Sequence, residues 1–76
     1  MSRGLHSPPY KKLRLLLTEA RARAGLTQLQ VAERVKRPQS YVSKYENGER
    51  QLDVIEFIAI CAAMNVHPCS LVEQLV

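Results

Sequence analysis

Residues 26–48 contain two short helical patterns that a break in the chain separates. The first pattern begins at Thr27, whose hydroxyl can cap the amides at a helix start, and Gln30 three residues later completes a capping box. The second follows Pro38, which disfavours helical geometry at the residue before it and suits the first turn of a new helix. Gly48 is a typical helix end. The sequence therefore predicts two short helices joined by a tight turn.

The second of these helices, expected over 39–47, has a narrow apolar side. Only Val42 and Tyr45 fall at the spacing of a buried stripe. The remaining side chains are polar and rich in hydrogen-bond donors, and we expect these to face outward: Gln39, Ser40, Tyr41, Ser43 and Lys44. Such a helix is buried along one side and presents a polar surface on the other.

The charge of the chain is divided between a basic half and an acidic half. Residues 1–44 carry ten basic side chains and two acidic ones, a net charge of +8, whereas residues 45–76 carry one basic and five acidic side chains, a net charge of −4. A basic surface attracts the phosphates of a nucleic acid, and added salt weakens such binding. The acidic half of the chain would then turn away from the nucleic acid. Composition alone equally allows a solvated surface on which the charges cluster by chance.

The central segment resembles the Cro/C1-type helix-turn-helix family of phage repressors and bacterial regulators, also called the Xre family. The resemblance extends over about residues 10–75, and its motifs are AGLTQ at 24–28, AER at 32–34 and SYVSKYENGER at 40–50. It implies an all-α, compact five-helix, lambda-repressor-like domain whose second and third helices form the helix-turn-helix. It also implies a sequence-specific, repressor-like transcriptional regulator with double-stranded DNA as its partner.

One position departs from the family pattern. Lys36 occupies a turn position that many phage repressors fill with Gly. If φ is positive at this residue, we expect a modest strain, because a side chain disfavours that conformation.

The resemblance also assigns roles in DNA recognition to individual residues. The residues facing base edges in the major groove would be Gln39, Ser40 and Lys44, with Ser43 as a secondary candidate. Contacts to the DNA backbone would come from Thr27, Gln28, Tyr41 and Asn47. Arg37 and Arg50 flank the reading helix, and both phosphate contact and simple solvation are open for them.

A further role implied by the resemblance is a pair between Arg21 and Glu46. The pair would hold the first helix against the end of the third and leave Arg21 near the DNA backbone. An exposed pair contributes only about 0–1 kcal/mol, so its value would be orientation rather than stability.

The length of 76 residues is enough for one domain with a modest aliphatic core. Residues 1–9 include Pro8 and Pro9 and predict a flexible N-terminal arm, and we expect the helix-turn-helix domain over 10–76. Outside the central segment, helices are expected over about 10–24, 53–64 and 68–75. The last helix would turn three residues inward: Leu71, Val72 and Leu75.

The helix expected over 53–64 begins with a second capping box, formed by Asp53 and Glu56, and is apolar on all sides. One face is enough to cover the core: Val54, Phe57, Ile58, Cys61 and Met64. The other sides carry four more apolar residues: Ile55, Ala59, Ile60 and Ala62. We expect these four to meet a second subunit, the N-terminal arm or the last helix. A homodimer on a palindromic operator is the assembly we predict.

Other classes of function find little support. Cys61, His67 and Cys69 lack a familiar metal-ligand spacing, and buried reduced thiols are commoner. Without a glycine-rich phosphate loop or convergent carboxylates, we expect no enzyme, cofactor or small-molecule ligand. Without an apolar run of membrane-spanning length or a secretion segment, we expect a cytoplasmic protein. The alternative function is a protein-interaction module on the same fold, docking a partner through the fourth or fifth helix, with weak or non-specific DNA binding.

Overall fold

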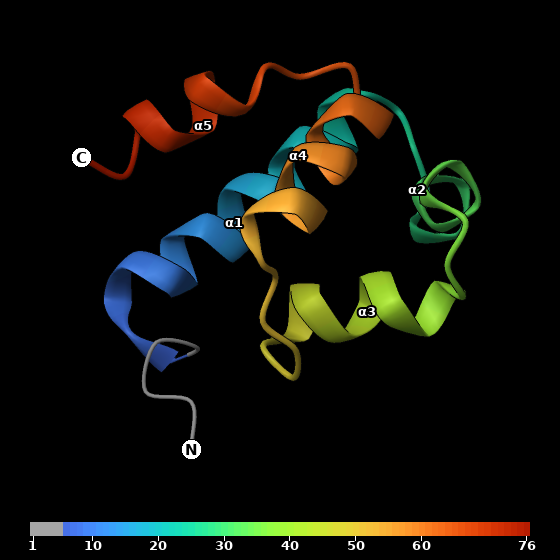
Figure 1. The fold of residues 1–76 in the computed structure, drawn as a ribbon, viewed down its shortest axis with the longest axis horizontal. Coiled ribbons are helices and arrows are strands. Elements are labelled where there is room, and N and C mark those ends of the chain that lie inside the picture. Colours follow the sequence, from blue (N-terminus) through green and yellow to red (C-terminus); the bar gives the residue numbers. More distant parts are fainter. Residues whose placement is uncertain (1–5) are drawn as a thin grey trace.

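The chain folds into five helices over the residues that the structure describes, 6–76, and contains no strand in this range. In the computed structural model the helices are α1 (Pro8–Arg23), α2 (Gln28–Val35), α3 (Gln39–Asn47), α4 (Val54–Ala63) and α5 (Pro68–Glu73). α3 packs against α2 and α1, while α5 packs against α1 and α4 on the far side of the molecule from α3 (Figure 1). The expected all-α arrangement of five helices is confirmed.

α1 begins earlier than expected. Its N-cap is Ser7, whose hydroxyl accepts a hydrogen bond from the Tyr10 amide over 3.3 Å. Pro8 and Pro9 take the first helical positions, where a missing amide hydrogen costs little because these amides have no partner inside the helix. Pro8 and Pro9, which we expected in the flexible arm, therefore belong to the helix. Residues 1–5 of that arm lie outside the part of the chain that the structure describes.

The turn between α2 and α3 depends on the left-handed conformation of Lys36, with φ of 60° and ψ of 46°. The Lys36 amide donates to the Glu33 carbonyl over 3.2 Å, and the Arg37 amide donates to the Ala32 carbonyl over 3.0 Å. These are the two hydrogen bonds of a Schellman motif, which favours glycine at the left-handed position. The positive φ on which the expected strain depends is therefore present. Pro38 differs from expectation, because it is the N-cap of α3 rather than a residue of its first turn.

Both predicted capping boxes are present. The Gln30 amide donates to the Thr27 hydroxyl over 3.1 Å, and the Thr27 amide donates back to the Gln30 side chain over 2.8 Å. At the start of α4, the Glu56 amide donates to Asp53 over 2.7 Å, and the Asp53 amide donates to the Glu56 carboxylate over 3.0 Å. Each box satisfies two amides that the helix itself leaves without a partner.

The core lies where the first four helices meet and is mainly aliphatic. Its largest fully buried side chains are Leu17, Val31, Val42, Tyr45, Ile60 and Cys61. α2 is also tied to the end of α4, because the Arg34 guanidinium donates to the Ala63 carbonyl over 2.7 Å. A cation at a helix C-terminus satisfies a carbonyl and complements the helix dipole. These contacts hold α2 and α3 on a rigid support.

α4 turns a different face to the core than expected. Ile60, which we expected on an outer side, is completely buried, whereas Val54 and Ile58 are 69% and 45% exposed. The inward stripe has regular helical spacing: Phe57, Ile60, Cys61 and Met64. Because nearly every residue of this helix is apolar, the sequence did not distinguish this stripe from its neighbour. The exposed apolar face consists of Val54, Ile55, Ile58, Ala59 and Ala62.

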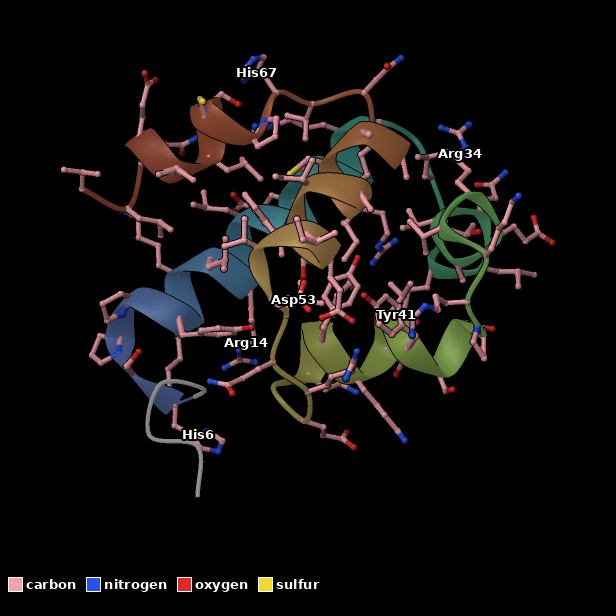
Figure 2. All side chains as sticks on the ribbon, viewed as in Figure 1. His6, Arg14, Arg34, Tyr41, Asp53 and His67 are labelled. Carbon is pink, nitrogen blue, oxygen red and sulfur yellow. The ribbon has the colours of Figure 1, made fainter. Side chains whose placement is uncertain are left out.

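α5 is shorter than expected and ends at Glu73. Its Leu71 is buried, but Val72 is 45% exposed, so the inward orientation expected of Val72 is wrong. The N-cap of the helix is His67, labelled in Figure 2, whose Nδ1 accepts a hydrogen bond from the Cys69 amide over 3.2 Å. The imidazole thus performs the capping role that a short polar side chain usually has.

Candidate nucleic-acid interface

A strip of polar side chains runs along the outer side of α3. Gln39, Ser40 and Lys44 are exposed, and Ser43 is half-buried. Asn47 extends the strip toward the end of the helix, where its Nδ2 donates to the Ser43 hydroxyl over 3.3 Å. Within the described residues the side chains of Ser40 and Lys44 make no hydrogen bond or ion pair, so their donors are available to a partner. The four predicted base-reading residues therefore share one helix and its solvent-facing side.

Tyr41 does not face outward as we expected. Its side chain is only 8% exposed and lies between α3 and α4 (Figure 2). Its ring meets that of Tyr45 edge-on, with 5.8 Å between the centroids, and the guanidinium carbons of Arg37 and Arg50 each lie 4.8 Å from its centroid. Burial raises the pKa of Tyr41 above that of a free tyrosine. The outward orientation was wrong because the two arginines that cover this ring come from outside α3. The contact of Tyr41 with a DNA backbone stays a prediction.

Arg37 and Arg50 are neither free nor simply solvated. The Arg50 guanidinium donates to Oε2 of Glu56, and the Arg37 guanidinium lies 3.8 Å from the same oxygen. Their side chains remain 49% and 36% exposed, respectively. Both cations therefore border the strip while sharing one carboxylate from α4.

The predicted pair between Arg21 and Glu46 is present and is more buried than expected. Arg21 Nε and Nη2 donate to the two carboxylate oxygens over 2.7 and 3.0 Å, and the exposed side-chain fractions are 18% for Arg21 and 5% for Glu46. The Arg21 guanidinium also donates to the Leu26 carbonyl over 3.0 Å. The hydrogen bond to Glu46 raises the pKa of Arg21 despite the opposing effect of burial. This two-point contact fixes α3 relative to α1.

Gln28 continues this network toward the strip. Its Nε2 donates to Glu46 Oε1 over 2.9 Å, and its Oε1 accepts a longer hydrogen bond of 3.5 Å from Gln39 Nε2. A carboxylate can only accept, so Glu46 requires the amino end of the Gln28 amide, and the oxygen end then meets Gln39. The side-chain amide of Gln28 already has two protein partners. Its expected contact with a DNA phosphate stays a prediction. Thr27 is exposed beside it at the start of α2, with its hydroxyl in the capping box.

Arg14 supports the end of α3, a role that our sequence analysis missed. Its Nη1 donates to the Glu46 carbonyl over 3.3 Å (Figure 2). Its guanidinium also covers Gly48, which has φ of 81°, and a Cβ built on Gly48 would lie 2.7 Å from Arg14 Nη1. The available signal was spacing, because Arg14 precedes Arg21 by two helical turns on the same face of α1.

Comparison with known proteins identifies the type of domain. A sequence model of the helix-turn-helix family matches residues 17–71, which include all of α2, α3 and α4. The solved structure of an XRE-family like protein from Pseudomonas syringae pv. tomato DC3000 is 48% identical, with a TM-score of 0.89 over 96% of this chain and 89% of that one. The chain belongs to the Xre family of helix-turn-helix proteins. Its fold is therefore that of a DNA-binding regulator, with α2 and α3 as the helix-turn-helix.

Two restriction-modification controller proteins share this Xre fold. C.AhdI from Aeromonas hydrophila is 27% identical, with a TM-score of 0.75 over 82% of this chain and 94% of that one. C.Esp1396I, solved as a tetramer in complex with its natural 35 base-pair operator, is 23% identical, with a TM-score of 0.83 over 92% of each chain. No curated protein sequence matches the chain.

Other features of this Xre domain bear on alternative functions. Within residues 6–76 no three His, Cys, Asp or Glu side chains come together as metal ligands do, and no helix has the length and apolar character of a membrane span. Cys61 is buried, which raises its pKa to about 11, whereas Cys69 is exposed. An apolar hollow of about 440 Å³ opens between α4 and α5, with Val54, Ile58, Val72 and Val76 in its lining.

Proposed function

We propose that the chain is a sequence-specific transcriptional regulator, of the repressor kind, that reads the DNA major groove with α3. The observation that carries the proposal is the exposed strip formed by Gln39, Ser40, Ser43 and Lys44. An α-helix fits the major groove, where each base pair displays a distinct set of donors and acceptors. Such a function belongs in the compartment that holds the DNA, the cytoplasm.

The chemistry of the strip suits particular base edges. The amide of Gln39 can bond adenine N6 and N7 together, and the ammonium group of Lys44 suits the O6 and N7 acceptors of guanine. The hydroxyls of Ser40 and Ser43 can donate or accept and so discriminate less. We expect sequence preference to come mainly from Gln39 and Lys44.

Contacts to the DNA backbone would surround this strip. Amides at the start of α2 and the side chain of Thr27 would lie beside it, next to Gln28, which contacts both Gln39 and Glu46, and Asn47 extends it at the end of α3. Three arginines add positive charge: Arg21, Arg37 and Arg50. Phosphate contacts of this kind fix the register of the protein on the duplex without reading its sequence.

We propose further that the regulator acts as a homodimer through α4 and α5. The exposed apolar face of α4 includes Ile55, which is 74% exposed, and it is continued by Val72 of α5 and by Val76, which follows that helix. Large exposed apolar patches commonly mark association surfaces. The expected interface keeps Ile55, Ala59 and Ala62, but Ile60 does not belong to it. The two copies would bind half-sites about one helical turn, ~34 Å, apart. C.Esp1396I, which binds its operator as a tetramer, supports the presence of more than one copy on DNA.

The apolar hollow between α4 and α5 also favours the alternative, a protein-interaction module with weak DNA binding. The two functions differ in their dependence on base sequence. A regulator selects a preferred duplex from a random pool, whereas an interaction module binds all duplexes alike.

The test is a variant that combines Gln39→Ala with Lys44→Ala. We expect each lost base contact to weaken binding to the selected duplex by about 1–3 kcal/mol, with binding to a random duplex much less affected. The matched control combines Gln51→Ala with Lys12→Ala, which removes the same residue types from exposed positions outside α3. If the α3 variant keeps the full preference of the wild type, α3 is not the reading helix.

A further inference from the structure

Glu56 lies at the centre of a cluster that joins α4 to both ends of α3. Its side chain is only 16% exposed. Oε1 accepts the Asp53 amide over 3.0 Å in the capping box, and Oε2 accepts from Arg50 and lies 3.8 Å from Arg37. The carboxylate is therefore held in place by the backbone of α4 and does not move freely with its cations.

The two arginines approach this carboxylate from either end of α3. Arg37 precedes the helix and Arg50 follows it, and each guanidinium carbon lies 4.8 Å from the centroid of the Tyr41 ring. Stacking on an aromatic ring and pairing with Glu56 both restrict where the guanidinium groups point. Both side chains are nevertheless more than a third exposed, so a phosphate beside α3 could reach them.

A DNA phosphate and Glu56 would compete for the same donors. Two guanidinium groups share one carboxylate here, so the cluster has a net charge of +1, and neutralising Glu56 would make it +2. We propose that Glu56 restrains the phosphate contacts of Arg37 and Arg50 and so lowers the affinity of the interface for DNA of any sequence. This inference rests on the proposed function, because it concerns how strongly that interface binds DNA of any sequence.

The restraint would act on every duplex alike, because phosphates are the same at every site. Phosphate contacts supply most of the non-specific affinity, whereas base contacts supply the preference. Weakening two phosphate contacts therefore lowers affinity for random DNA and affinity for the operator by about the same factor. Glu56 would thereby set how tightly the interface binds DNA and leave the ratio of operator affinity to random affinity unchanged.

The test is Glu56→Gln, which removes the charge and keeps the capping box, because glutamine also serves at this capping position. We expect tighter binding to a duplex of arbitrary sequence and a log–log salt dependence steeper by about 0.9 for each arginine released. The control is Glu19→Gln, an equal change of net charge at an exposed residue whose side chain makes no hydrogen bond or ion pair with the described residues. Equal or weaker binding of Glu56→Gln, or the same gain in both variants, overturns the proposal.

A second comparison assigns the gain to the two arginines. In a chain that carries Arg37→Ala and Arg50→Ala, the further change Glu56→Gln should leave the salt dependence unaltered. A full gain in that background overturns the proposal. If the wild-type chain shows no sequence preference, the proposed function fails, but the Glu56 comparison is still decided on random DNA. If the chain binds no duplex, the salt concentration that elutes each variant from heparin tests the proposal. Glu56→Gln should elute at a higher salt concentration than Glu19→Gln, and elution of both at the same concentration overturns the proposal.

Discussion

Gln28 Nε2 donates a hydrogen bond of 2.9 Å to Oε1 of Glu46, and this bond fixes which end of the Gln28 amide meets Gln39. The same carboxylate accepts two hydrogen bonds from Arg21. Glu46, at the end of α3, therefore holds α1 in place and also orients the Gln28 amide beside Gln39, the first residue of α3.

The first prediction concerns Glu46→Gln. We expect the free energy of unfolding to fall by about 2–4 kcal/mol, because the partly buried Arg21 loses its charged partner. An amide can also donate, so the orientation of Gln28 is no longer fixed, and preference at the base read by Gln39 should weaken. Urea unfolding measures the first effect. Glu49→Gln, at an exposed position, is the control and should change stability by less than about 0.5 kcal/mol; equal effects of the two changes would refute the assigned role.

The second prediction concerns the turn of the helix-turn-helix. Lys36 and Asn65 are the two non-glycine residues with positive φ among those described, at 60° and 59°. Lys36→Gly should stabilise the fold by about 0.5–1 kcal/mol, because glycine adopts this conformation without a side-chain clash. Asn65→Gly should gain less, since asparagine tolerates it better than lysine. Thermal unfolding ranks the variants, and a destabilised Lys36→Gly would contradict the strain at this turn.

The third prediction separates the core of α4 from its exposed face. Ile60→Ala should lower stability by about 2–5 kcal/mol, because the side chain is fully buried. Ile55→Ala should leave the unfolding of the monomer nearly unchanged and weaken self-association, because Ile55 is 74% exposed. Denaturation at low concentration and sedimentation across concentrations measure the two effects. Self-association that is indifferent to Ile55→Ala would remove α4 from the proposed interface.

The fourth prediction concerns Tyr45, whose buried hydroxyl has no hydrogen-bond partner among the described residues. Burial raises the pKa of this group, so the unfolded chain loses the proton first as pH rises. The contribution of Tyr45 to stability is thus intact below about pH 10 and declines above it. Tyr45→Phe should flatten this alkaline decline and stabilise the neutral protein by about 1 kcal/mol. An unchanged decline in urea unfolding at alkaline pH would show that another group causes it.

Local signals in the sequence predicted much of this fold. The capping boxes at Thr27 and Asp53 depend on residues three apart, so short-range chemistry determines them. The pair of Arg21 with Glu46 followed from the family pattern, which also marked Lys36 as a position where φ could be positive.

Features that depend on contacts between distant segments were harder to predict. The burial of Tyr41 depends on Arg37 and Arg50, which lie on either side of the helix that carries the ring. The rotation of α4 could not be read from its sequence, because several stripes of that helix are equally apolar. Arg14 has no motif of its own, and its role appears only when α1 packs against the end of α3.

The central claim is that α3 reads the major groove, and methylation interference on a duplex selected from a random pool tests it most directly. Methylation of guanine N7 blocks an acceptor that only the major groove displays. We predict interference at guanines in two half-sites about one helical turn, ~34 Å, apart, and its loss at one position of each half-site in Lys44→Ala. Binding that is indifferent to guanine N7 methylation throughout a guanine-containing selected duplex would contradict the account.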